Sequence, residues 1–130
     1  MRGWIPYTLM CLGLLACKDE TVAGYGALDT PWRLVEIDGQ AFPAQATLQF
    51  GTHGEISGNA PCNRYFGRQT APYPWFAAEE LGTTRRACPA LAHETAYLSA
   101  LAAMTLSEVA GDTLILSNDA GREMVFRAAQ

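Results

Sequence analysis

Most of the chain consists of short segments that alternate apolar and polar residues and are separated by turn residues. The clearest segment, 32–37 (WRLVEI), is followed at once by Asp38-Gly39, a strong signal for a tight turn. Alternation of this kind buries one face of a strand and exposes the other. Further strands are expected, in chain order, at 47–50, 54–58, 64–68, 113–116 and 123–126, the last two joined by a turn at 118–121.

The period changes once along the chain. From Pro89 to Met104 the apolar residues recur at helical spacing, alanines fill much of the rest, and proline suits a first helical turn. Because strands and helices do not alternate, a doubly wound sheet is not expected. The pattern predicts an α+β fold: a curved antiparallel sheet or an incomplete (cracked) β-barrel, with one helix packed on the open side.

The strand pattern fails around Pro72 and Pro74, because proline cannot donate a hydrogen bond within a central strand. The segment around them is expected to be an edge strand or a loop. Its aromatic residues Tyr73, Trp75 and Phe76 form a candidate contact loop. The favoured alternative is that Trp75 or Phe76 closes the core.

The N-terminal residues 1–16 predict a secretory signal peptide. They contain one charged residue, Arg2, followed by a largely apolar run that ends in small residues. The uncharged run is shorter than the roughly 18 to 20 residues that span a bilayer. It also contains Pro6, so an anchor helix is the weaker interpretation.

The run Leu14-Leu15-Ala16-Cys17 resembles the bacterial lipobox, in which the cysteine is acylated and becomes the first residue of the mature chain. Cys17 is therefore the candidate lipidation site. In lipoprotein sorting, Lys18 in place of an aspartate would imply the outer membrane of a Gram-negative cell. The expected organisation is a lipoprotein signal peptide at 1–16, a lipid-anchored tether at 17–31 and one domain at 32–130.

The charge of the chain argues against nucleic-acid binding. There are 9 Lys and Arg against 13 Asp and Glu, a formal net charge of −4, and the basic residues form no block. Phosphate binding depends on clustered positive charge. Nucleic acid is therefore excluded as a partner.

Four cysteines are present. Cys11 would leave with the signal peptide and Cys17 would carry lipid, which leaves Cys62 and Cys88 in an oxidising compartment. A pair of cysteines in a small exported domain most simply forms a disulfide. A metal site and a catalytic thiol are the weaker alternatives, because neither the ligands of zinc nor a base for the thiol can be identified from spacing.

The helix carries a carboxylate, Glu94, on or beside its apolar stripe. A buried carboxylate needs a partner, and a structural ion pair with Arg64 or Arg85 is expected. A catalytic carboxylate is the alternative. The run His93-Glu94-Thr95-Ala96-Tyr97 begins like the zinc-protease motif HExxH but lacks the second histidine. No catalytic residue, metal site or cofactor is predicted, and the chain is not expected to be an enzyme.

Several short motifs, in the same order, resemble the META domain of HslJ-like proteins. They are Trp32-Arg33-Leu34, Ile37-Asp38-Gly39, Ile56-Ser57-Gly58, Cys62-Asn63-Arg64-Tyr65-Phe66-Gly67, Thr84-Arg85-Arg86-Ala87-Cys88, Glu94 with Leu98 and Leu101, and Gly111-Asp112-Thr113-Leu114-Ile115-Leu116. The resemblance extends from about Trp32 to Phe126. At Arg86 the family pattern has methionine, which weakens a packing argument at that position.

The resemblance implies a small α+β domain, exported or lipid-anchored in many members, with links to stress or envelope functions and no established catalytic activity. It also implies that Cys62 and Cys88 are the two family cysteines. The expected function is that of a non-enzymatic, lipid-anchored envelope protein that acts through protein contacts.

Two alternative functions remain. A carrier of a small apolar ligand or lipid would need an unfilled cavity between helix and sheet, lined by Leu98, Leu101 and aromatic residues. An inhibitor of an envelope hydrolase would need a protruding loop, for which residues 70–76 are the candidate. The partners considered are therefore the membrane, an envelope protein and a small apolar ligand.

Overall fold

The computed structural model describes residues 19–129. In this part of the chain, nine strands form one sheet, with one α-helix and two short 3-10 helices. The strands are β1 (Trp32–Ile37), β2 (Gln40–Ala41), β3 (Thr47–Phe50), β4 (Glu55–Asn59), β5 (Arg64–Arg68), β6 (Glu79–Thr83), β7 (Leu106–Ala110), β8 (Thr113–Ser117) and β9 (Glu123–Ala128). The helices are η1 (Val22–Tyr25), η2 (Thr52–Gly54) and α1 (Leu91–Ala103).

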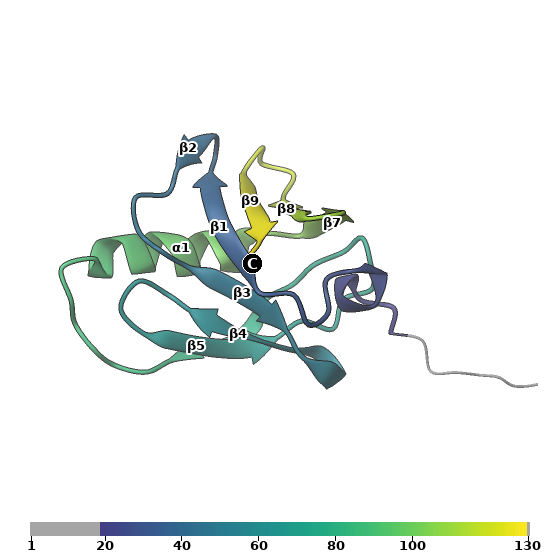
Figure 1. Ribbon diagram of the computed structural model, residues 1–130, viewed down its shortest axis with the longest axis horizontal. Helices are drawn as coiled ribbons and strands as arrows, with labels where there is room; N and C mark the ends of the chain where they lie inside the picture. The colour runs from purple at the N-terminus through teal and green to yellow at the C-terminus, as the bar shows by residue number, and fades with distance from the viewer. Residues whose placement is uncertain (1–18, 130) are drawn as a thin grey trace, which may run out of the picture.

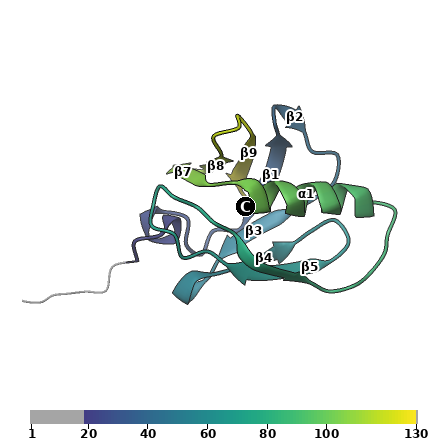
Figure 2. The same ribbon diagram turned by 180° about the vertical axis from the view of Figure 1, so that it is seen from behind.

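The sheet is antiparallel and strongly curved. Its strands follow the order β6-β5-β4-β3-β1-β9-β8-β7, and β2 pairs with β1 beside this path. Figure 1 and Figure 2 show the sheet curled into a half-open barrel, with α1 lying across its open side. The predicted α+β fold, an incomplete barrel with one helix on the open side, is confirmed.

The strands with regular alternation were predicted well, because their inward residues are apolar. β1, β3 and β5 have the expected bounds, and β8 and β9 contain the expected segments. Three strands were missed: β2, β6 and β7. β2 has two residues, β6 begins with two glutamates, and β7 turns a serine, Ser107, toward the core. Their pairing with neighbouring strands overrides weak local preference.

Large aromatic side chains fill the interior between the sheet and α1. Trp32, Tyr65, Tyr97 and Phe126 are almost wholly buried. The ring centroid of Tyr97 lies 5.6 Å from that of Tyr65 and 6.5 Å from that of Phe126, in edge-to-face geometry. The helix predicted at 89–104 therefore covers the core with the face that carries Tyr97.

Residues 19–31 do not form the predicted tether. Val22 and Ala27 have no exposed surface, and both belong to the main hydrophobic core. Trp32 donates its indole N–H to the carbonyl oxygen of Ala27 at 3.1 Å. The folded domain thus begins before Trp32. No periodic pattern marks this segment, because η1 is a single short turn made largely of small residues.

The described chain is fixed to the domain from its first residue. The carboxylate of Asp19 accepts hydrogen bonds from the backbone N–H of Thr21 at 2.9 Å and from its hydroxyl at 2.6 Å. A Cβ at Gly24 would overlap the backbone oxygen of Asp19. Only residues 17 and 18 of the predicted tether lie outside the described part.

The predicted disulfide between Cys62 and Cys88 is confirmed. It joins the loop before β5 to the segment before α1, across a sequence separation of 26 residues. The bridge closes a loop that contains β5 and β6, so it restricts the unfolded chain far more than a local link would.

Replacing Cys62 with serine should lower the free energy of unfolding by about 3 to 4 kcal/mol, because the unfolded chain regains the entropy of the open loop. Urea denaturation of the wild type and of Cys62→Ser measures the difference. Reductant should destabilise the wild type by a similar amount and leave Cys62→Ser unchanged. Equal stability of the two oxidised proteins would contradict a structural role for the bridge.

Candidate functional site

Glu94 is buried in the first turns of α1, and its carboxylate is held by amide groups. Only 4% of the residue is exposed. One oxygen accepts hydrogen bonds from the backbone N–H groups of Cys62 at 2.8 Å and Asn63 at 2.9 Å. The other accepts from the side-chain NH2 of Asn63 at 2.7 Å. The buried charge is therefore stabilised by three donors.

The expected ion pair of Glu94 with Arg64 or Arg85 is wrong. Within residues 19–129 the salt bridges are Arg122 to Asp38 and Arg127 to Asp112. Arg64 is exposed and donates to the side-chain oxygen of Asn59 at 3.3 Å, and Arg85 is also exposed. No cation is needed at Glu94 because the loop before β5 points two backbone N–H groups at its carboxylate.

Asn63, which the sequence analysis did not single out, connects three parts of the fold. Its side-chain oxygen accepts from the hydroxyl of Thr84 at 2.9 Å and from the backbone N–H of Arg86 at 2.6 Å. Its NH2 group donates to the carbonyl oxygen of Arg86 at 2.9 Å and to Glu94. A polar residue directly after a cysteine in a glycine-bracketed segment was the available signal. Asn63 and Glu94 form a structural centre beside the disulfide.

A second polar contact in the core involves Tyr65 and Tyr97. Their hydroxyl oxygens are 2.7 Å apart, and Tyr65 donates to the carbonyl oxygen of Thr47 at 2.6 Å. Burial raises the pKa of both hydroxyls well above the ordinary value for tyrosine. Gly58 permits this approach, since a Cβ there would overlap the oxygen of Thr47. These tyrosines hold the barrel together as neutral groups.

Changing Glu94 to glutamine should reduce stability by about 1.5 to 3 kcal/mol, the usual contribution of hydrogen bonds to a charged group. The glutamine oxygen can still accept the two backbone N–H groups, but its NH2 would face the NH2 of Asn63. Chemical denaturation measures the loss. The exposed Glu79, changed to glutamine, should stay within about 0.5 kcal/mol of the wild type. Similar losses in both variants would argue against the role of the carboxylate.

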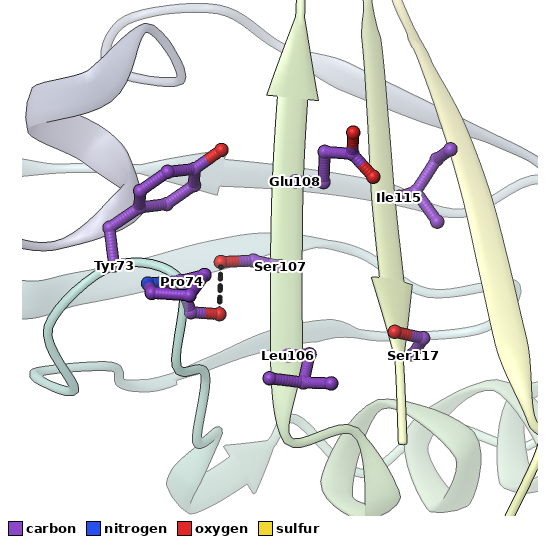
Figure 3. A pocket seen from close by; sticks show the side chains of 7 residues that line it. All are labelled: Tyr73, Pro74, Leu106, Ser107, Glu108, Ile115 and Ser117. Atoms are coloured by element: carbon purple, nitrogen blue, oxygen red, sulfur yellow. Dashed lines mark hydrogen bonds between the residues drawn. The ribbon is translucent and has the colours of Figure 1, made fainter. Parts of the chain in front are cut away.

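An open surface groove lies on the outer side of β7 and β8 and is shown in Figure 3. This β7 groove has a volume of about 420 Å³. Leu106 and Ile115 supply apolar surface, Glu108 a carboxylate, and the ring of Tyr73 stands at the side. The carbonyl oxygen of Pro74 accepts hydrogen bonds from the Ser107 backbone N–H at 2.7 Å and hydroxyl at 3.2 Å.

The candidate contact loop is divided between core and surface. Phe76 is 2% exposed and closes the core, as the favoured alternative predicted, whereas Trp75 is 57% exposed. Tyr73 is half-buried and stacks on Tyr25 with ring centroids 4.5 Å apart. The backbone N–H of Phe76 donates to the carbonyl oxygen of Thr105 at 2.9 Å. The loop is thus fastened along the edge of β7 and does not protrude as an inhibitory loop would.

The second groove lies between the β1–β2 hairpin and α1. This hairpin groove has a volume of about 240 Å³. Its apolar lining includes Ile37, Phe42, Pro43 and Ala96, and its polar lining includes Gln40, His93 and Arg122. No sequence pattern predicts this groove, because it depends on how β2 and α1 meet in space.

The walls of the hairpin groove are held firmly. The ring of Phe42 contacts that of His93, with centroids 6.1 Å apart. At the other wall, Asp38 accepts two hydrogen bonds from Arg122, at 3.1 and 3.0 Å, and one from the backbone N–H of Glu123 at 2.9 Å. The bonds from Glu123 and Arg122 lower the pKa of Asp38, so this wall keeps its charge pair at neutral pH.

Other predicted features are placed as follows. Cys17 and the signal peptide lie outside the described residues. Within residues 19–129, no group of three or more His, Cys, Asp and Glu is arranged to hold a metal ion. No helix in the same part of the chain is long and apolar enough to cross a membrane.

Comparison with solved structures supports the fold. A protein from Burkholderia xenovorans, solved by NMR, is similar to this chain with a TM-score of 0.68 and 27% identity, over 97% of this chain and 99% of that one. A DUF4847 family protein from Bacteroides vulgatus has a TM-score of 0.64 at 11% identity, over 82% of this chain and 96% of its own, and shows similarity of fold alone.

No curated protein in the comparison matches the chain. The family model of the META domain matches residues 26–130, which is most of the sequence. The match begins before Trp32, in agreement with the packing of Ala27 in the core. The resemblance inferred from the motifs is confirmed, and the chain belongs to the META domain family.

Proposed function

We propose that this protein is a non-enzymatic, lipid-anchored protein of the bacterial cell envelope, on the periplasmic face of the outer membrane. In this proposal it acts in envelope stress or maintenance through contacts with other proteins. The observation that carries the contact role is that each buried polar side chain bonds to another part of the fold.

The buried polar and charged residues of the described part are Asn63, Gln69, Glu94 and Ser107. Glu94 and Asn63 bond to each other, and Ser107 donates to Pro74. The side-chain oxygen of Gln69 accepts from the backbone N–H groups at positions 71 and 77, at 3.1 and 2.9 Å. A catalytic site normally directs polar groups into a cleft, where substrate can meet them. Groups committed to the fold favour a contact role over catalysis.

The two alternatives receive less support. A carrier would need space beneath α1, but Leu101 is fully buried within the hydrophobic core and the aromatic rings around Tyr97 occupy the interior. An inhibitor would need a free loop, but residues 72–76 are bonded along β7. What the domain offers a partner is its outer surface.

The hairpin groove is the surface we assign to a protein partner. Its apolar lining and polar rim have the composition of a small interface, with Phe42 held by neighbouring rings. The Asp38–Arg122 contacts fix the second wall before binding. Binding to a surface that is already ordered costs less conformational entropy.

The lipid anchor can be tested by mass spectrometry of the intact protein, extracted from its own membrane without reductant. We expect a chain that begins at Cys17, carries acyl groups on that residue and has Cys62 bonded to Cys88. Cys17→Ala should remove the acyl mass and release the protein from the membrane fraction. An unacylated wild-type chain would contradict the proposal, and a bound small apolar molecule would favour the carrier.

The protein contact can be tested by placing a photo-crosslinking amino acid at Gln40, on the rim of the hairpin groove, in living cells. We expect a discrete crosslinked protein because the partner covers this groove. The same amino acid at Glu79, exposed on β6 at the far edge of the sheet, is the matched control and should give none. Crosslinks of equal pattern and strength at both positions would contradict a specific contact.

A further inference from the structure

The described chain begins beside a group of exposed aromatic residues. Asp19 is bonded to Thr21, and the carbonyl oxygen of Glu20 accepts a hydrogen bond from the backbone N–H of Tyr73 at 2.7 Å. Cys17 lies two residues before Asp19, a distance of at most ~7 Å along the chain. The candidate lipidation site therefore cannot lie far from Tyr73.

We define the aromatic patch as Tyr25, Tyr73, Trp75 and Leu106. Tyr25 and Trp75 are 45% and 57% exposed. The stacked rings of Tyr25 and Tyr73 join η1 to the loop, and the bridge between Trp75 and Leu106 joins the loop to β7. In Figure 3, Tyr73 lies between the pale ribbon of η1 and β7.

The aromatic patch and the hairpin groove lie at different ends of the domain. β1 starts at Trp32, which is bonded to Ala27 just after η1, and ends at Ile37, which lines the hairpin groove. Figures 1 and 2 both show η1 on one side of the molecule and the first turn of α1 on the other. A surface that covers the patch would leave the groove accessible.

We propose that the aromatic patch rests on the lipid bilayer and fixes the orientation of the domain on the membrane. This rests on the proposed acylation of Cys17. Tryptophan and tyrosine favour the interface between headgroups and hydrocarbon, because an apolar ring and a polar N–H or O–H are both accommodated there. With so short a connection to the lipid, the patch meets the bilayer at high effective concentration, so weak contacts suffice.

The charges near the patch select the type of lipid. Asp19 and Glu20 stand at the start of the described chain, and Glu108 lies on β7 across the groove from Tyr73, so acidic residues outnumber the single Lys18 that follows Cys17. Acidic side chains are repelled by anionic headgroups. The docking surface therefore fits a zwitterionic bilayer, held through its rings and aliphatic side chains.

The fluorescence of Trp75 tests the orientation directly. Of the three tryptophans, Trp4 lies in the predicted signal peptide, and Trp32 is 1% exposed inside the core. The acylated mature protein, which begins at Cys17 and lacks Trp4, would be reconstituted into phosphatidylcholine vesicles with bromine on the upper part of the acyl chains, a quencher that acts only at short range. We expect loss of most of the Trp75 emission, measured as the difference between the wild type and Trp75→Phe.

A tryptophan at the opposite end provides the control. The double variant Trp75→Phe/Gln40→Trp should keep its emission in the same vesicles, because Gln40 lies at the hairpin groove. Protein that stays on the vesicles without quenching of Trp75 would overturn the docking and leave the lipid anchor intact. Protein that does not stay on the vesicles would overturn both. Equal quenching at positions 75 and 40 would mean a free orientation and would also refute the proposal.

Discussion

The acceptance of three N–H hydrogen bonds by the Glu94 carboxylate is the contact on which the arrangement of sheet and helix depends. The first turn of α1 has no side-chain cap, and its N-cap residue is Ala90. The position of the helix is set instead by Glu94, which ties it to Cys62 and Asn63. A buried carboxylate without these donors would be very costly, so the loop before β5 and the helix must form together. The disulfide then joins the same two segments covalently.

With α1 held over the open side of the sheet, side chains fill the interior of the barrel. Aromatic rings from β5, β9 and α1 pack against one another beneath the helix, and the tyrosine hydroxyls among them bond to each other. Such packing supports the proposed contact role over that of a carrier. The two grooves, by contrast, lie outside the sheet or at the margin of the helix.

The sequence predicted the strands whose buried residues are apolar. It did not predict the features that depend on backbone hydrogen bonds or on contacts between distant segments. Alternation located β1 and β3, but Ser107 faces inward in β7 because Pro74 accepts its hydroxyl. The position of Glu94 beside the apolar stripe of the helix indicated that it needs a partner, but it did not indicate which residue that partner is. An arginine partner can be sought in a sequence because its side chain is charged. Every residue except proline has a backbone N–H, so the sequence does not show which N–H groups will bind a carboxylate.

The early start of the folded domain determines how an anchored form of this protein could be placed. With a tether over 17–31, a domain could rotate freely above a membrane, and no face would be distinguished from another. Because Asp19 is bonded to Thr21, just before η1, and Glu20 to Tyr73, only a two-residue step separates Cys17 from the folded domain. Acylation at Cys17 would then bring one particular end of the barrel to the bilayer. The same geometry would turn the hairpin groove toward the compartment, so anchoring and partner binding would use opposite ends of β1.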